Sequence, residues 1–364
     1  MKIFEIIKFI ETFAPLELQD SFDNSGLQIG NVFGEVKGIL LCLDITEKVI
    51  DEAIEQTCNL IISHHPLLFN PLKKIVGQTY VERCIVKACK NDITIYSAHT
   101  NLDNAVGGLN FRLAEKIGLR NIKVLRHRRG ELLKLVTFVP LKQVETVRNA
   151  LFDAGAGNIG DYDFCSFNSI GEGTFRAGEN SHPFVGECGK FHVEKEIRIE
   201  TVFPSLKKRE VLNALLASHP YEEPVYDFYP LLNSWDGAGT GVIGELITEE
   251  NEKSFLKKIK AIFHLKTLEY SSFIGKTIRK VALCGGSGAF LIQDAIACKA
   301  DVFLTGEAKY NDFYEVENKI LLAIIGHYES EYCAKGIFFD IISKKIPNIA
   351  LYLSDTDTNP VNYM

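Results

Sequence analysis

Short apolar runs alternate with helical patterns along the first third of the chain. The apolar runs predict strands at Gly38–Asp44, Leu60–Ser63 and Ile93–Ala98. Apolar residues at helical spacing predict the helices between and after them, which are Glu47–Gln56, Tyr80–Lys90 and Gly108–Ile117. Strands and helices that alternate in this way predict a largely parallel α/β sheet covered by helices on both faces.

The same layout is repeated near the C-terminus. Residues 280–331 read KVALCGGSGAFLIQDAIACKADVFLTGEAKY…ILLAIIGHYESE, and residues 38–103 read GILLCLDITEKVIDEAIEQTCNLIISHHPL…ITIYSAHTNLD. The aligned pairs are Cys284 with Cys42, Val302–Thr305 with Leu60–Ser63, Gly306-Glu307 with His64-His65, His327 with His99, and Glu331 with Asp103. Such internal repetition predicts a duplicated strand–helix–strand core, with two lobes that face each other across a pseudo-two-fold axis and share one site.

The pattern changes from about residue 126. Strands are predicted at KLVTFVP, Glu196–Val202 and Pro224–Tyr229, and helices at VETVRNALFDAG and LKKREVLNALLASHP. Together with the Gly-rich stretch between residues 162 and 196, the order is the β-α-β-β-α-β of a ferredoxin-like α+β domain. The chain is therefore predicted to have a core formed by residues 1–126 and 236–364, with a ferredoxin-like domain at 127–235 inserted between the two halves.

Polar segments separate these parts. The basic stretch Lys123–Arg129 is predicted to be a solvated linker, and the Gly-containing stretch Asn233–Gly241 is predicted to bound the insert. His182, His192 and His219 lie inside the insert, and they are interpreted as hydrogen-bonded structural residues.

Composition excludes several classes of protein. The chain has 364 residues and a net charge of −7, which argues against a basic nucleic-acid-binding surface. Nine cysteines without a Cys-x-x-Cys pair suggest neither a disulfide framework nor a thiolate zinc site. The N-terminal stripe of Ile3, Ile6, Ile7, Ile10 and Phe13 predicts an amphipathic docking helix that ends before Pro15, not a signal peptide. No apolar run approaches the length of a membrane span, and a cytoplasmic protein is expected.

Candidate metal ligands follow the predicted strands. His64-His65-Pro66 ends one strand, and His99 with Asp103 follows the next. Pro66 favours an extended conformation for His65, so both adjacent imidazoles can face one cleft. A helix that begins at His327 would place Glu331 on the same helical face, a spacing used to bind divalent metals. For each pair taken alone, an ion pair or a helix-terminus contact is the alternative.

The number of donors favours two ions. His64, His65, Asp103, His327 and Glu331 exceed what one ion with an open coordination position needs. They suit a pair of ions that share a carboxylate and activate water at neutral pH. Mixed imidazole and carboxylate ligands suit zinc, iron(II) or manganese. His99 and Glu307 are interpreted as groups that orient ligands or transfer protons.

Two loops have both a structural and a functional interpretation. In SFDNSGLQIGN, a turn is favoured over a role for Asp23 and Asn24 in lining the metal cleft. The glycine-rich loop Cys284–Ala289 could present backbone amides to a phosphate, but it lacks the lysine of a P-loop. A tight strand-to-helix turn is an equally good interpretation of that loop.

Five motifs together carry a family resemblance. SHHPLLF, AHTNLD, CGGSGA, GHYESE and DNSGLQIG resemble the family named GTP cyclohydrolase 1 type 2, also called the Nif-three-like proteins. The resemblance covers nearly the whole chain. YDFCSF, GEGTFR and SHPYEEPVYD are similar to the middle domain of the longer bacterial members, which is itself similar to small trimeric PII and CutA proteins.

The resemblance implies a fold, a site and an activity. It implies a Nif-three-like two-lobed domain with a dinuclear metal centre on His64, His65, Asp103, His327 and Glu331. It also implies a toroidal homohexamer, and hydrolytic opening of the guanine ring of GTP to dihydroneopterin triphosphate and formate. The chain departs from many members at Asn311, where they have a histidine. The alternatives are a metal-dependent phosphoesterase, and a non-catalytic metal-delivery ring or interaction scaffold.

Overall fold

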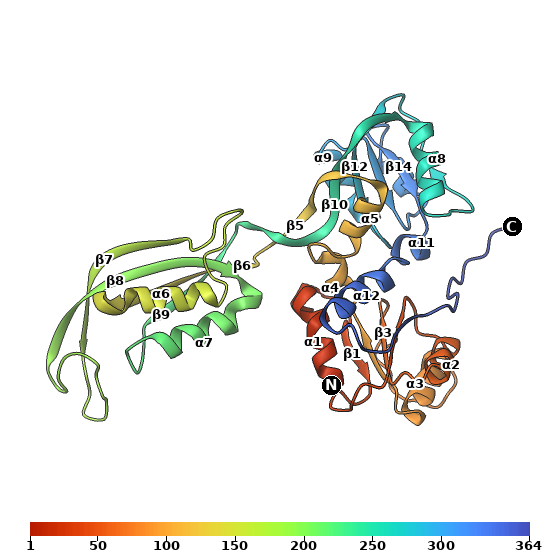
Figure 1. Ribbon diagram of the computed structural model, residues 1–364. Coiled ribbons are helices and arrows are strands. Elements are labelled where there is room, and N and C mark those ends of the chain that lie inside the picture. Colours follow the sequence, from red (N-terminus) through yellow and green to blue (C-terminus); the bar gives the residue numbers. More distant parts are fainter. The chain divides into compact units, whose positions relative to one another are not determined.

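Fifteen strands form three sheets in the computed structural model, which describes residues 1–364 and has a mixed α/β fold (Figure 1). Contacts divide the chain into two compact units. One unit combines Met1–Arg126 with Gly237–Met364, and the other is His127–Asp236. None of the helices has the combination of length and apolar character that a membrane span requires.

The first sheet of the larger unit has the strand order β1-β4-β3-β2-β15. Its strands are β1 (Gly26–Ile29), β2 (Ile39–Cys42), β3 (Leu60–Ser63), β4 (Thr94–Ser97) and β15 (Leu351–Leu353). All pairs are parallel except β1 with β4, which is antiparallel. All residues of β2, β3 and β4 are buried, as expected for strands covered on both faces.

The second sheet repeats this arrangement with the strand order β11-β14-β13-β12-β10-β5. Its strands are β5 (Arg120–Arg129), β10 (Ser234–Asn251), β11 (Glu269–Tyr270), β12 (Thr277–Cys284), β13 (Val302–Thr305) and β14 (Leu321–Ile324). β12, β13 and β14 are parallel, and β11 pairs with β14 in the antiparallel direction, as β1 does with β4. Cys42 pairs with Ser63 in one sheet, and Cys284 pairs with Thr305 in the other, which agrees with the predicted alignment.

Capping residues define the ends of several helices. Thr46 and Thr79 cap two helices by accepting hydrogen bonds from the amides of Val49 and Glu82, and Gly118 ends a third at φ 89°. The helices of the larger unit are α1 (Ile3–Phe13), α2 (Glu47–Glu55), α3 (Tyr80–Lys90), α4 (Thr100–Asn104), α5 (Leu109–Ile117), α8 (Glu252–Ile262), α9 (Ile292–Ala297), α10 (Asp312–Glu315), α11 (His327–Glu331) and α12 (Ala334–Lys345). Short 3₁₀ turns occur at Leu16–Leu18, Leu141–Gln143, Ser205–Lys207 and Ala289–Leu291.

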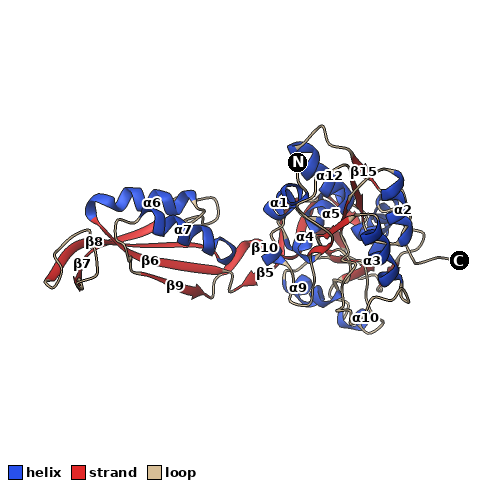
Figure 2. Cartoon of the chain, turned by 90° about the horizontal axis from the view of Figure 1, so that it is seen from below, coloured by secondary structure: helices blue, strands red, loops and turns tan.

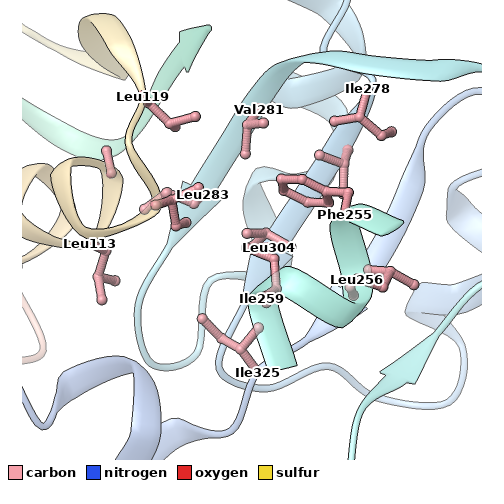
Figure 3. Packing of buried hydrophobic residues seen from close by; sticks show 14 of the residues in the cluster. Leu113, Leu119, Phe255, Leu256, Ile259, Ile278, Val281, Leu283, Leu304 and Ile325 are labelled. Atoms are coloured by element: carbon pink, nitrogen blue, oxygen red, sulfur yellow. The ribbon is translucent and has the colours of Figure 1, made fainter. Parts of the chain in front are cut away.

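Apolar side chains from both halves of the sequence share one core in the larger unit. Leu113 and Leu119 from the first half pack with Phe255, Val281 and the other apolar residues around α8 and the second sheet (Figure 3). Burial of a large apolar side chain contributes about 1.5–3 kcal/mol. The core therefore joins the two halves of the unit although the insert separates them in the sequence.

The smaller unit is a four-stranded antiparallel sheet with two helices. The strand order is β7-β8-β6-β9, and Figure 2 shows α6 and α7 on the same side of this sheet. Its elements are β6 (Leu132–Pro140), α6 (Val144–Asp153), β7 (Ser166–Arg176), β8 (Phe191–Pro204), α7 (Lys208–Ser218) and β9 (Tyr226–Leu231). Leu135, Val147, Ile199, Phe203 and Leu215 are among the residues that form its separate core.

Both segments at the ends of the insert lie in strands. Lys123–Arg129, predicted to be a solvated linker, belongs to β5. Asn233–Gly241, predicted to bound the insert, contains the division between the two units at Asp236 and Gly237, and most of it belongs to β10. Composition misleads here because β5 and β10 are neighbours in a sheet, so their backbone groups are paired. Gly239 makes this close pairing possible, because a Cβ atom there would lie 2.3 Å from the carbonyl oxygen of Arg126.

Candidate metal centre

The ends of two parallel strands position the first histidines. His64 and His65 follow β3, and their amides donate to the carbonyl oxygens of Cys42 and Leu43, so neighbouring chain holds both residues. Their ring centroids lie 5.1 Å apart, and His64 is fully buried. The two adjacent imidazoles therefore face the same region, as the strand-end position suggests.

Glu331 is the centre of the cluster. It comes from α11, and only 2% of it is exposed. Its Oε2 lies 2.8 Å from His65 Nε2 and 2.9 Å from His327 Nε2, and its Oε1 lies 3.8 Å from His64 Nε2. One carboxylate thus contacts histidines from both halves of the larger unit.

Asp103 completes the buried side of the cluster. Its Oδ1 lies 3.6 Å from His64 Nε2, and neither atom has a hydrogen-bond partner although both are buried. Buried polar atoms without partners are rare, because their desolvation costs about 1–3 kcal/mol each. A cation between them would satisfy both atoms.

The other ring nitrogen of each histidine has a partner that fixes the ring. For His64, Nδ1 lies 2.9 Å from the carbonyl oxygen of Ala98, which can only accept, so Nδ1 carries the proton and Nε2 presents a lone pair to the cluster. The same role is filled by carboxylates for the other three histidines. The contacts are His65 with Asp44 at 2.7 Å, His99 with Asp23 at 2.8 Å and His327 with Glu307 at 2.9 Å.

The two buried carboxyl groups have opposite pKa shifts. Burial and the neighbouring Glu331 charge raise the pKa of Asp103 well above its ordinary value. Burial opposes ionisation of Glu331 as well, but the neighbouring imidazoles of His327, His64 and His65 outweigh it and hold the pKa of Glu331 well below the usual range. Without a metal ion, Glu331 therefore ionises readily in the cluster, whereas ionisation of Asp103 is unfavourable.

The pKa values of His64 and His65 are also shifted in opposite directions. Burial lowers the pKa of His64, which favours the neutral, metal-binding form. For His65, burial is outweighed by Asp44 and Glu331, which raise the pKa to about 10. His65 has a carboxylate next to each ring nitrogen, so its imidazole is protonated when no metal is bound. A metal cation bound at Nε2 would displace the proton from that nitrogen.

Three overlapping groups of side chains could each hold a metal ion. They are His64 with Asp103 and Glu331, His65 with His327 and Glu331, and His64 with His65 and His99. All of the predicted ligands fall into the first two groups. His99 joins the third group, and Glu307 contacts the cluster through His327. The imidazole and carboxylate donors, together with two unpartnered buried atoms, fit a divalent metal.

Sequence reasoning missed two of the supporting carboxylates. Asp44 follows β2 and contacts His65, but the sequence gives it no motif. The sequence favours a turn at Asp23, but its carboxylate accepts hydrogen bonds from Ser25, from the Thr100 amide and from His99. These bonds hold the pKa of Asp23 below its usual range in spite of burial. The signal that could have identified Asp23 is its place in the DNSGLQIG motif.

The glycine-rich loop is a tight turn. The amides of Gly285, Gly286 and Gly288 donate to the side chains of Asn110, Ser330 and Thr305. These three amides are therefore not available to a phosphate. For these amides, the interpretation of the loop as a phosphate-binding loop is wrong.

Two further sequence expectations concern residues outside the cluster. His192 and His219 are hydrogen-bonded within the smaller unit, as the structural interpretation expects. Asn311 is exposed and precedes α10, and its side chain caps nothing. It belongs to none of the three groups of potential ligands.

A cavity of about 390 Å³ adjoins the cluster. Asp44, His65, Glu307 and His327 line it on the cluster side. Its other walls include Lys266, Tyr328, Asn359, Pro360, Val361 and Tyr363. Its size lies within the range of small-molecule sites. A ligand in this cavity would lie next to the side chains that face the cluster.

The fold and the cluster define an α/β protein whose two sequence halves supply one potential metal site. The chain belongs to the Duf34/NIF3 (NGG1p interacting factor 3) family, whose model matches residues 1–360. It is 43% identical over 84% of its length to the "GTP cyclohydrolase 1 type 2 homolog" of Halalkalibacterium halodurans, covering 82% of that protein. The Bacillus subtilis protein of the same name is 38% identical, with 99% of this chain and 98% of the relative covered.

A solved structure agrees with the fold over the full length. The Bacillus cereus "protein related to NIF3" has a TM-score of 0.87 and 38% identity, and the match covers 100% of this chain and 99% of that one. The family resemblance stated from the motifs is therefore confirmed.

Proposed function

We propose that this protein is a hydrolase with a dinuclear divalent metal centre. The observation that carries the proposal is the position of Glu331, which is common to two of the three potential ligand groups. His65 and His327 lie on its Oε2 side, and His64 lies on its Oε1 side with Asp103. A carboxylate with ligand partners on both oxygens suits a bridge between two ions.

The chain's own residues would do the following work. His64, Asp103 and Glu331 would hold one ion, and His65, His327 and Glu331 would hold the other. Zinc, iron(II) and manganese all accept such mixed ligands. When bound, the ions would supply Lewis acidity that lowers the pKa of water and polarises the group under attack.

His99 is proposed to transfer protons at this centre. It lies beside the cluster, its ring centroid is 5.2 Å from that of His64, and Asp23 holds its Nδ1. This arrangement leaves Nε2 as the nitrogen that can exchange a proton with a reacting group. Glu307 is proposed to orient His327, because its carboxylate lies 2.9 Å from His327 Nδ1.

GTP is the first substrate to test. The curated relatives carry the name "GTP cyclohydrolase 1 type 2 homolog", and the cavity next to the cluster can hold part of a nucleotide. The proposed reaction opens the guanine ring by hydrolysis, with formate and dihydroneopterin triphosphate as products. The reaction is hydrolytic, so the metal centre would act as a Lewis acid without redox change.

Two further proposals concern architecture. The smaller unit is proposed to be ferredoxin-like, because its element order β6-α6-β7-β8-α7-β9 and its strand order β7-β8-β6-β9 suit that fold. A toroidal homohexamer is proposed from the family resemblance and can be tested by light scattering.

Metal content tests the centre directly. Protein purified without chelators or a His-tag is expected to contain about two divalent ions per chain by elemental mass spectrometry. His64→Ala and Glu331→Ala should lose metal and keep the fold, whereas Glu329→Ala on the same helix should keep the metal. Full metal occupancy in both ligand variants would contradict the assignment.

Activity assays then separate the functions. The metal-loaded protein should release formate from GTP and give a fluorescent pterin, and Glu331→Ala should abolish both signals. Cleavage of simple phosphate esters with no attack on GTP would instead identify a phosphoesterase. No turnover together with rapid metal exchange would identify a metal carrier.

A further inference from the structure

A second cavity lies wholly within the smaller unit. Its volume is about 470 Å³, and β7, the end of β6 and the segments at residues 177–184 and 221–225 form its walls. It lies on the sheet face that α6 and α7 leave open, because Ile197 and Ile199 of β8 enter the helical core and the alternate residue Glu196 points the other way. None of the candidate metal-binding residues lines it.

Carboxylates dominate the charge of this cavity. Glu172, Glu196, Glu222 and Glu223 line it, and Arg176 is the one basic residue among the lining side chains. Glu196 is 7% exposed, and no lysine, arginine or histidine forms an ion pair with it. A buried carboxylate without a cationic partner is costly, so its presence in a cavity favours a cationic ligand.

The Glu196 carboxylate is held in place. The Tyr221 hydroxyl donates to Oε1 at 2.7 Å, and burial together with the nearby carboxylate raises the pKa of Tyr221, which keeps this donor protonated. Oε2 has no hydrogen-bond partner. It lies against Gly173, where a Cβ atom would come within 2.3 Å of it. One oxygen is therefore fixed and the other is available to a ligand.

His219 supports Tyr221 from behind. Its Nε2–H donates to the carbonyl oxygen of Phe138 at 2.9 Å, and its Nδ1 accepts the Tyr221 amide at 3.1 Å. Burial lowers the pKa of His219, which favours the neutral ring that these two bonds require. The wall next to Glu196 is thus preorganised.

Aromatic rings form the other walls. The ring centroids of Phe175 and Phe184 lie 6.4 Å and 6.3 Å from that of Tyr221, and all three residues line the cavity. Aromatic faces attract ammonium and guanidinium groups through their quadrupoles. A bare metal ion suits the cavity less well, because none of the three groups of potential metal ligands includes its residues.

We propose that this cavity binds a small organic cation, specifically an aliphatic amine whose ammonium group contacts Glu196 Oε2. The methylene chain of the amine would lie against Phe175, Phe184 and Tyr221, and a second ammonium group would face the exposed carboxylates Glu222 and Glu223. A diamine of four to six carbons carries both features.

Calorimetric titration of the full-length protein tests this proposal with two probes of matched length and opposite charge. Cadaverine should bind saturably with one site per chain, and glutarate should not bind. Glu196→Gln should weaken cadaverine binding by at least about tenfold. Glu223→Gln, at an exposed position that does not endanger folding, should weaken it by about two- to threefold.

Glu200→Gln is the matched control. Glu200 lies on the same strand and sheet face, but Lys134 and Arg198 pair with it, so the substitution removes the same charge without touching the cavity. Its cadaverine affinity should remain unchanged. If Glu200→Gln and Glu196→Gln weakened cadaverine binding equally, the effect would be nonspecific electrostatic attraction, and the proposal would be overturned. Unchanged binding in Glu196→Gln, absence of saturable cadaverine binding, or tighter binding of Mg²⁺ than of cadaverine would also overturn it.

Discussion

The carboxylate of Glu331 lies 2.8 Å from the imidazole of His65, although 266 positions separate the two residues in the chain. His65 follows a strand of the first sheet, and Glu331 lies on α11 after a strand of the second. Neither half of the sequence has all of the proposed metal ligands, because His64, His65 and Asp103 come from one half and His327 and Glu331 come from the other. The candidate metal site therefore depends on how the two halves pack.

Gly286 gives a direct test of that dependence. Its φ is +58°, and a Cβ atom there would lie 2.2 Å from Oε1 of Glu331. We predict that Gly286→Ala displaces Glu331 and lowers metal content by more than half. Elemental mass spectrometry of the purified variant measures the change.

Gly275→Ala is the control for backbone strain. Gly275 has φ +79° and nothing within 4 Å of the added Cβ atom, so both variants share a left-handed strain of about 1–2 kcal/mol. Only Gly286→Ala also meets Glu331. Equal metal content in the two variants would show that the position of Glu331 does not determine metal binding.

Asp103→Asn should raise the stability of the metal-free protein and lower the stability of the metal-bound protein. The pKa of Asp103 is raised by burial and by Glu331, so ionisation destabilises the metal-free fold as pH rises above about 3.9, the ordinary aspartate value. The amide removes this penalty, and the metal-free variant should gain at least about 1 kcal/mol at pH 7. Thermal melts with and without a chelator test this expectation.

The metal-loaded variant should lose most of its metal-dependent stabilisation, because one ligand is missing. A variant that is less stable than wild type in both states would place Asp103 in a structural network and not in a metal site.

Strands and ligand types could be predicted from the sequence, because both signals are local. The apolar runs Leu60–Ser63 and Val302–Thr305 are strands with the predicted bounds. A polar residue precedes each run, and a histidine or a glycine follows it. The alignment between the two copies of the repeat is less accurate after the last parallel strand of each copy. His99 lies two residues after Ser97, whereas His327 lies three residues after Ile324, which is the residue equivalent to Ser97 in the register. A sequence alignment cannot detect this one-residue difference.

The carboxylate partners of His99 and His65 could not be predicted, because they depend on tertiary packing. Asp23 contacts His99 across 76 positions, and Asp44 contacts His65 from a neighbouring strand end. Neither residue has a spacing that indicates its role. Conversely, the amides of the CGGSGA loop looked free in the sequence, but the fold brings Asn110, Thr305 and Ser330 to them.

Asp44 should contribute to metal affinity without binding the metal. Its Oδ1 lies 2.7 Å from His65 Nδ1, which orients the ring and makes Nε2 a better ligand. Asp44→Asn should weaken metal binding by about 10–100-fold with the fold unchanged. Competition with a chromogenic chelator measures the affinity.

Thr358→Val is the comparison for this variant. The Thr358 hydroxyl donates to the other oxygen of Asp44 at 2.6 Å, so its loss leaves the bond to His65 intact. A change of less than about threefold is expected, since the other oxygen of Asp44 makes the contact with His65. An effect of Thr358→Val as large as that of Asp44→Asn would mean that the C-terminal segment, and not His65, transmits the change.

Glu52 should control the attachment of the C-terminal segment. Its carboxylate accepts hydrogen bonds from the hydroxyls of Ser354 and Thr356 and from the amide of Asp355. The segment continues to Asn359, Pro360, Val361 and Tyr363, which line the cavity beside the candidate metal site. Glu52→Gln should therefore speed hydrogen exchange in the C-terminal peptide, whereas Glu55→Gln, an exposed position on the same helix, should not.

The pH dependence of this attachment has a defined sign. Burial opposes ionisation of Glu52, but the hydrogen bonds from Ser354 and Thr356 hold its pKa below the ordinary value of 4.5. A lowered folded-state pKa means that the stabilising contribution is present above pH 4.5 and is lost as pH falls through the folded value. Wild-type exchange in this peptide, corrected for intrinsic rates, should accelerate below about pH 4.5 and approach that of Glu52→Gln. A constant difference between wild type and Glu52→Gln across this range would contradict the role of the Glu52 charge.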